Sequence, residues 1–257
     1  MAALNGARVL VTRPAHQADH LSGLISERGG VAIRLPTLEI ARVDDAGKIK
    51  QKLAILDKFQ WLVFVSANAV TMHHYYLDGG RMPHAQHTRF AAIGAATAEA
   101  MALAGLPVDV VPEHGYSSEA LLAMPQMQPI AGQAFLIVRG AGGREELADS
   151  LRSRGASVDY LDVYKRVIPA IDHSDVLSLL AQGRLDAITI TSGEALQNLL
   201  IMLGENYHRL LFAIHLIVVS DRIRQMAADM GFKQIAVAAG PSDAAILEAV
   251  TKCLTGE

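Results

Sequence analysis

The sequence contains very little cysteine and no long apolar segment. Cys253 is the only cysteine among 257 residues, so a disulfide framework is impossible and a reducing compartment is expected. The longest apolar run, 210–219, is interrupted by His215 and is about ten residues long, whereas a membrane helix needs roughly 20. The first residues lack a basic head followed by a long apolar core, so we expect no signal peptide. These absences predict a soluble protein of the cytoplasm.

Charge is also sparse and nearly balanced. Charged residues make up 19% of the chain, the net charge is -3 and hydrophobic residues reach 51%. This composition supplies a packed core and gives no indication of general affinity for nucleic acid.

The common motifs of metal, nucleotide and serine-hydrolase sites are missing. No H-E-x-x-H or C-x-x-C occurs, and the adjacent His73 and His74 cannot share one helix face. The glycine-rich stretch 139–145 has the spacing of neither phosphate-binding loop, and no G-x-S-x-G is present. We therefore expect no metal site, no nucleotide cofactor and no hydrolase serine.

Short apolar runs alternate with helical patterns along the whole chain, which predicts an α/β fold with parallel sheets. Most runs are continuously apolar, as is typical of strands covered on both faces. Gly29, Gly105, Gly155 and Gly231 follow helical patterns and are expected to be left-handed caps. Strands are expected at 7–12, 31–36, 61–65, 89–93, 108–111, 134–138, 157–162, 186–190, 215–219 and 234–238. Helices are expected at 16–28, 67–78, 95–104, 144–154, 193–203 and 221–230.

An internal repeat is visible when the sequence is compared with itself at an offset of 126 residues. Arg13 then aligns with Arg139 and Ser66 with Ser192. Gly94 aligns with Ser220, and with a slip of one residue 115–124 aligns with 240–250. One α/β unit has been used twice, which predicts two similar domains with a cleft between them. The repeat leaves open whether the halves are separate domains or exchange strands.

Small polar residues lie where predicted strands pass into helices. Helix N-termini at the carboxyl ends of parallel strands offer free N–H groups and a partial positive charge, which favours an acidic ligand. The alternative for each residue is plain helix capping. The residues at these junctions are Ser66, Gly94 with Thr97, Ser117, Ser192, Ser220 and Ser242.

Arg13 and Arg139 end predicted strands at equivalent positions of the repeat. An arginine at this position can bind a carboxylate with two hydrogen bonds, and the alternative is a surface ion pair. Tyr164 follows the predicted strand 157–162. Its phenol could donate a proton, but from the sequence alone a half-buried aromatic residue is the better interpretation.

The chain resembles the uroporphyrinogen-III synthase family over essentially its full length. The resemblance rests on the order and spacing of several short stretches. They are VLVTRP, FVSANAV, AAIGAATAEAM, FLIVRGAGGRE, VYKR, TSGEAL, VVSDRI and the terminal GPSDAAILEAV.

This resemblance implies two flavodoxin-like domains with exchanged halves. Residues 1–37 and 169–257 would form one discontinuous domain and residues 40–166 the other. Two short extended linkers, 37–40 and 165–169, would join them.

The resemblance also implies a lyase of porphyrin synthesis that works without metal or organic cofactor. It would close hydroxymethylbilane into uroporphyrinogen III, inverting the last pyrrole ring and releasing water. Tyr164 matches the family tyrosine that assists loss of the hydroxyl. Thr97, Ser66 and Ser192 match residues lining the cleft, and Arg13, Arg139 and Ser220 are further candidates for substrate binding.

Two other interpretations compete with the interpretation as an enzyme. Two α/β lobes would also suit a binding protein that closes on a small anion without chemistry. A regulatory module would need an effector domain, for which no residues remain. We expect a monomer acting on a small-molecule polycarboxylate, without nucleic acid or membrane partners.

Overall fold

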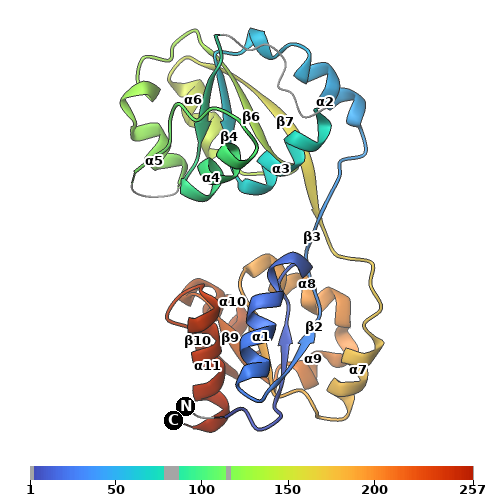
Figure 1. Ribbon diagram of the computed structural model, residues 1–257. Helices are drawn as coiled ribbons and strands as arrows, with labels where there is room; N and C mark the ends of the chain where they lie inside the picture. Colours follow the sequence, from blue (N-terminus) through green and yellow to red (C-terminus); the bar gives the residue numbers. More distant parts are fainter. Residues whose placement is uncertain (1–2, 78–86, 114–116, 257) are drawn as a thin grey trace. The chain divides into compact units, whose positions relative to one another are not determined.

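The computed structural model describes residues 3–77, 87–113 and 117–256. They divide into two compact units, one formed by Met1–Glu39 with Val167–Glu257 and the other by Ile40–Arg166 (Figure 1). Each unit contains its own sheet and its own helices, and each is described separately.

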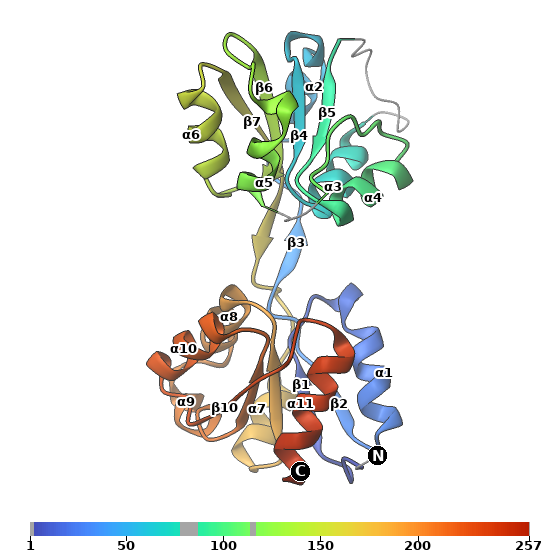
Figure 2. The same cartoon turned by 90° about the vertical axis from the view of Figure 1, so that its left-hand side faces the viewer.

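The first unit is a five-stranded parallel sheet with helices on both faces. Its strand order is β10-β9-β8-β1-β2. The strands are β1 (Arg8–Val11), β2 (Val31–Arg34), β8 (Ala187–Ile190), β9 (His215–Val218) and β10 (Gln234–Val237). One face carries α1 (Asp19–Glu27) and α11 (Asp243–Thr255), as Figure 2 shows. The other face carries α7 (Ser174–Ala181), α8 (Gly193–Leu203), α9 (Glu205–Leu211) and α10 (Asp221–Met230).

The second unit repeats this layered plan. Its strand order is β3-β7-β6-β4-β5, and the pairings from β7 to β5 are parallel. The strands are β3 (Glu39–Ala41), β4 (Trp61–Phe64), β5 (Arg89–Ala92), β6 (Ala134–Gly140) and β7 (Ser157–Val167). One face packs on α2 (Ala46–Leu53), α3 (Ala67–Tyr76) and α4 (Ala95–Leu103). The opposite face packs on α5 (Ser118–Ala123) and α6 (Glu146–Ser153).

Strand β4 is apolar throughout because its sheet is covered on both sides. In β4, Leu62 and Phe64 enter the core below α2, α3 and α4, whereas Trp61 and Val63 enter the core below α5 and α6. Alternate residues of a strand point to opposite faces, so neither set can be polar. The prediction of parallel sheets buried on both faces is confirmed.

The internal repeat is present in the structure. Strands β4 and β8 begin at Trp61 and Ala187, and strands β5 and β9 begin at Arg89 and His215. Both pairs have the offset of 126 residues found in the sequence. The first unit combines the first two strands of one repeat with the last three of the other, which is the exchange of halves expected from the resemblance. The left-handed glycines are also confirmed: Gly29, Gly105, Gly155 and Gly231 all have positive φ.

Two sequence-based expectations about the second unit were wrong. Residues 108–111 do not form a strand; Val110 makes a single parallel bridge to Ala91. Strand β7 does not end at residue 162 but continues to Val167, so Tyr164 lies within it.

The expected linkers 37–40 and 165–169 overlap β3 and the end of β7, which are neighbours in the sheet. Residue 78 of the expected helix 67–78 and residues 115 and 116 of the aligned stretch 115–124 lie outside the described residues.

Among the described helices, none is both long and apolar enough to cross a membrane.

Candidate functional site

The serines at the strand–helix junctions are helix caps. Each side-chain oxygen accepts a hydrogen bond from the backbone N–H three residues later, as an N-cap does. For Ser66 this bond comes from Ala69 over 3.1 Å, and for Ser192 from Ala195 over 3.0 Å. Ser117, Ser220 and Ser242 make the same contact at 3.3, 3.4 and 3.3 Å. Gly94 is the N-cap of α4 without a side-chain bond.

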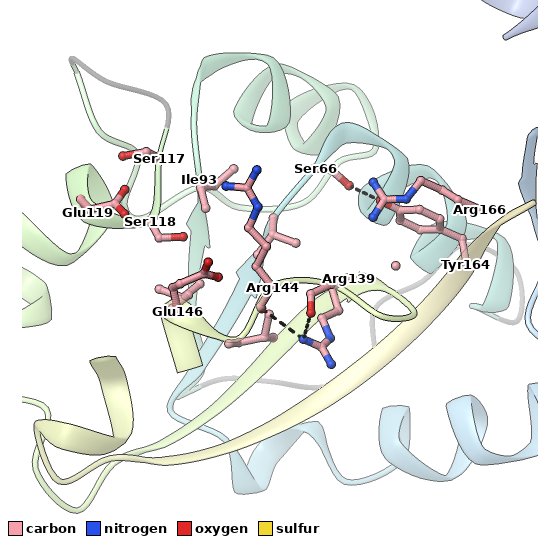
Figure 3. A pocket seen from close by; sticks show the side chains of 15 residues that line it. Ser66, Ile93, Ser117, Ser118, Glu119, Arg139, Arg144, Glu146, Tyr164 and Arg166 are labelled. Atoms are coloured by element: carbon pink, nitrogen blue, oxygen red, sulfur yellow. Dashed lines mark hydrogen bonds between the residues drawn. The ribbon is translucent and has the colours of Figure 1, made fainter. Parts of the chain in front are cut away.

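A cavity of about 350 Å³ opens in the second unit at the carboxyl ends of β4 and β6. Four of the residues named in the sequence analysis line it together, namely Ser66, Ser117, Arg139 and Tyr164. Figure 3 shows these side chains with their neighbours from α5, α6 and the loop after β6. The remaining labelled lining residues are Ile93, Ser118, Glu119, Arg144, Glu146 and Arg166.

Ser66 and Tyr164 form a hydrogen-bonded pair in this cavity. Ser66 Oγ and the Tyr164 phenol oxygen are 3.2 Å apart, and either atom can donate. Tyr164 is only 5% exposed, so its ring is held by the core and its hydroxyl lies at the cavity wall. Because Ser66 Oγ already accepts the Ala69 N–H, its own proton can be donated to the phenol oxygen. The Tyr164 proton is then free to point into the cavity.

Arg139 is bound by groups of the protein itself. Its Nε donates to Asp162 over 3.0 Å, and its Nη1 donates to Glu145 over 2.8 Å and to the Gly143 carbonyl over 3.1 Å. Its guanidinium carbon lies 3.6 Å from the centre of the Tyr160 ring. Burial opposes the charge of Arg139, but the hydrogen bonds to Glu145 and Asp162 outweigh it and raise the pKa of the guanidinium. Arg139 therefore stays charged and ties the loop after β6 to β7.

Glu145 completes this arrangement. Tyr160 donates a hydrogen bond to its carboxylate, and Arg139 donates another. These bonds, that of Tyr160 first, lower the pKa of Glu145. The pKa of Tyr160 is raised, first by burial and then by the bond to Glu145. At neutral pH the Glu145 carboxylate and the neutral Tyr160 phenol thus hold the loop after β6 in place.

Arg144 has a different environment. It is exposed, and its guanidinium makes no hydrogen bond or ion pair with any of the described residues. Figure 3 shows its side chain extending across the cavity. Hydrogen bonding to Ser117, together with a smaller effect of the Arg144 charge, lowers the pKa of Glu119 on the opposite wall. Arg144 is the side chain of the loop best placed to meet an incoming anion.

The other predicted residues do not line this cavity. Thr97 is buried in the first turn of α4, at 4% exposure. Arg13, Ser192 and Ser220 belong to the first unit. Arg13 binds Asp243 over 2.5 Å and the Pro241 carbonyl over 2.8 Å, so, like Arg139, it is held by the protein.

The sequence analysis did not identify several residues of the cavity wall. Ser118, Glu119 and Glu146 lie at the starts of α5 and α6, and only this position could have indicated them. Arg166 lies near the end of β7, in the quoted stretch VYKR, but was given no role. Ile93 directly follows β5 and contributes apolar wall. The cavity wall therefore combines hydroxyl groups, three arginines, two glutamates and a buried phenol. Such a set can bind a carboxylate and deliver a proton.

A metal centre has no support in the described part of the chain. Within residues 3–77, 87–113 and 117–256, no three His, Cys, Asp or Glu side chains are grouped so that they could hold a metal ion.

Known proteins of one family match this chain over most of its length. The family model described as uroporphyrinogen-III synthase HemD matches residues 19–248. A uroporphyrinogen-III synthase of Salmonella typhimurium is 32% identical over 246 residues, which cover 94% of this chain and 99% of that protein. The uroporphyrinogen-III synthase of Escherichia coli is 31% identical over 244 residues, which cover 94% and 99%.

Solved structures show the same fold at low identity. A mutant uroporphyrinogen III synthase from Thermus thermophilus superimposes with a TM-score of 0.64 at 16% identity, covering 98% of this chain and 100% of that one. A uroporphyrinogen-III synthetase from Helicobacter pylori gives a TM-score of 0.57 at 16% identity, covering 94% and 97%. The family model spans most of the chain, and full-length relatives exceed 30% identity. This protein therefore belongs to the uroporphyrinogen-III synthase family.

Proposed function

We propose that this protein closes linear hydroxymethylbilane into uroporphyrinogen III, inverting the last pyrrole ring and releasing water. The observation that carries the proposal is the family match over residues 19–248. This match includes every residue that lines the cavity, from Val65 to Arg166. Membership of the family makes the protein a lyase of porphyrin biosynthesis.

The substrate carries many carboxylate arms, and the cavity offers groups that bind them. The N-terminus of α3 presents backbone N–H groups behind Ser66, and Arg144 supplies a positive charge. A volume of about 350 Å³ is at the low end for small-ligand pockets, so the cavity receives one part of the four-ring chain. Arg139 acts here by holding the loop that carries Arg144.

Further carboxylate arms are proposed to meet other helix starts. Ser192 and Ser220 cap α8 and α10 in the first unit, where Arg13 also follows β1. Thr97 lies in the first turn of α4 in the second unit. Several helix N-termini bind several carboxylates without requiring a strongly basic protein.

Tyr164 is proposed to assist the departure of the hydroxyl group. Its phenol proton passes to the hydroxyl oxygen as the carbon–oxygen bond breaks, and water leaves. Closing the ring at a pyrrole carbon then releases one proton, which restores the phenol. The electron-rich pyrrole supplies most of the driving force, so a weak acid is sufficient. The larger contribution of the protein is to fold the chain so that the inverted ring closes.

The proposal includes a monomer that acts in the cytoplasm without metal or organic cofactor. Size-exclusion chromatography with light scattering tests the oligomeric state. A mass of about twice the chain mass would contradict the monomer.

An isomer assay tests the function. Fresh hydroxymethylbilane is mixed with the purified protein in the presence of a chelator, and the oxidised porphyrins are separated. We expect mainly isomer III. Isomer I alone, formed at the rate without protein, would contradict the enzyme and favour the alternative, a non-catalytic two-lobed protein that binds small anions.

A further inference from the structure

The pairing of β6 with β7 changes register at the cavity. Partners run regularly from Ala134 with Ser157 to Arg139 with Asp162. The next partner of Gly140 is Tyr164 and not Val163, so β7 contains one extra residue at this point. Such a bulge re-aims the side chains that follow it. Ala141 then donates to the Tyr164 carbonyl over 2.7 Å, which holds the shifted register beyond the bulge.

The bulge determines which way Tyr164 points. Before it, β7 alternates regularly, because Leu161 is buried and Asp162 is half-exposed. After it, Val163 and Tyr164 are both buried, at 0% and 5% exposure, and both join the core that packs on α3. Alternation alone would send adjacent residues to opposite faces. The extra residue thus brings the Tyr164 ring to the face where Ser66 begins α3.

The space for that ring comes from the absence of a side chain at Gly140. A Cβ built at Gly140 would lie 2.5 Å from Tyr164 Cε2, 2.6 Å from its Cζ and 3.0 Å from its hydroxyl oxygen. These distances are far below normal carbon contacts. Backbone strain is not the reason for glycine here, because Gly140 is not among the residues with positive φ. The ring of Tyr164 lies directly against the Gly140 backbone.

We propose that Gly140 is a positioning residue for Tyr164: only glycine at this bulge lets the phenol reach Ser66 and the cavity wall. Any side chain at position 140 would overlap the ring, because ring atoms of Tyr164 are the nearest neighbours of the added Cβ. The catalytic consequence rests on the proposed function, in which Tyr164 is the proton donor. The displacement itself does not depend on that function.

The first experiment compares Gly140→Ala with Tyr164→Phe. Both variants should remain folded and lose turnover by a similar factor, about 100-fold, at the lower end of acid–base assistance. The control is Gly23→Ala in α1, where an added Cβ meets nothing within 4 Å, and its turnover should equal that of wild type.

The second experiment observes the ring directly. The protein contains six tyrosines, and each is replaced by 3-fluorotyrosine for fluorine NMR. The Tyr164 resonance is identified by its loss in Tyr164→Phe. In Gly140→Ala this resonance should shift while the other tyrosine resonances stay in place.

A double-mutant cycle on thermal unfolding gives a readout independent of activity. Gly140→Ala should lower the midpoint in the wild-type background, where the ring occupies the space. In the Tyr164→Ala background it should have little effect, because the ring is gone. Additive losses would show that the added methyl group harms the fold by another route and would overturn the inference.

The positioning role of Gly140 and the acid role of Tyr164 can be contradicted separately. An unshifted Tyr164 resonance with wild-type turnover in Gly140→Ala overturns the positioning role. A shifted resonance and a non-additive cycle, together with wild-type turnover in Tyr164→Phe, support the positioning role and overturn the acid role of Tyr164.

Discussion

Ser66 connects a helix start to the phenol of Tyr164 through a single oxygen atom. It accepts the Ala69 N–H and lies 3.2 Å from the Tyr164 hydroxyl. The sequence analysis gave helix capping and cleft lining as alternatives for Ser66, and in the structure Ser66 caps α3 and also lines the cavity. The contact with Tyr164 could not be predicted, because the two residues are 98 positions apart.

Replacing Ser66 with alanine should affect stability and turnover together. The lost cap lowers the free energy of unfolding by about 1 kcal/mol, and the lost partner leaves the Tyr164 phenol without its orienting bond. We expect turnover to fall several-fold, less than in Tyr164→Phe. Urea denaturation and the isomer assay measure the two effects.

The matched control is Ser242→Ala at the start of α11, where the serine caps through Ala245 and does not line the cavity. It should lose similar stability and keep wild-type turnover. Equal turnover in both variants would contradict a role for Ser66 beyond capping.

The buried His73 is expected to make the free energy of unfolding depend on pH. It is fully buried in α3, neither ring nitrogen has a hydrogen-bond partner among the described residues, and its ring meets Phe64 edge-on at 5.2 Å. Burial, and to a lesser degree the charge of His74, lowers the pKa of His73 to about 4. In the unfolded chain the pKa is about 6.5.

The unfolded state therefore binds the proton first, and stability falls as pH decreases from about 6.5 to about 4. The loss approaches about 3 kcal/mol from His73 alone. Urea denaturation of wild type and of His73→Leu at a series of pH values measures it. The leucine variant should lose less stability over this range, and an identical pH dependence in both proteins would contradict the assignment.

At the scale of elements, the loop between β6 and α6 depends on Arg139. The side chain is 10% exposed and bridges Asp162 of β7 to Glu145 at the start of α6. Both carboxylates are about half-exposed, so the bridge contributes less than the 3–5 kcal/mol of a fully buried pair.

Arg139→Met should reduce the free energy of unfolding by about 2 kcal/mol. It should also raise KM, because the loop no longer holds Arg144 across the cavity. The control is Lys252→Met, which removes the exposed pair with Glu248 on α11 and should change stability by less than about 0.5 kcal/mol. A KM unchanged by Arg139→Met would contradict the loop role.

The sequence predicted the elements better than their irregularities. Continuous apolar runs were sufficient to place β4, β6, β8 and β9, because burial on both faces leaves a strong pattern. The run 108–111 was also expected to be a strand, but it is interrupted by Asp109 and only Val110 pairs. The bulge in β7 left no signal, because it depends on a register that two strands set together.

The ion-pair partners of the charged residues could not be predicted from the sequence either. Arg13 and Arg139 were identified as possible carboxylate binders, and both bind carboxylates, but those carboxylates belong to the chain. Which anion an arginine meets depends on loops that are distant in sequence or without regular pattern. The composition around the arginine does not contain that information.

At the scale of the molecule, one α/β unit used twice explains the order of the chain. The repeat was visible from the sequence because cap residues and strand ends recur at a fixed offset. It could not show that β1 pairs with β8 and not with β4, since both arrangements satisfy the same local pattern. The family resemblance supplied that assignment, and the observed strand orders agree with it.

The arrangement predicts that the second unit folds alone. Residues 40–166 are continuous and contain two cores, one on each face of their sheet. A fragment of residues 39–167, which keeps β3 and β7 intact, should unfold cooperatively with urea. A fragment without cooperative unfolding would contradict the proposed domain boundaries.

The most direct test of the account is the rate of isomer III formation by wild type and Tyr164→Phe under identical conditions. The account predicts mainly isomer III from wild type, and isomer III formed about 100-fold more slowly by a fully folded Tyr164→Phe. Equal rates for the two proteins, or isomer I alone from wild type, would contradict it.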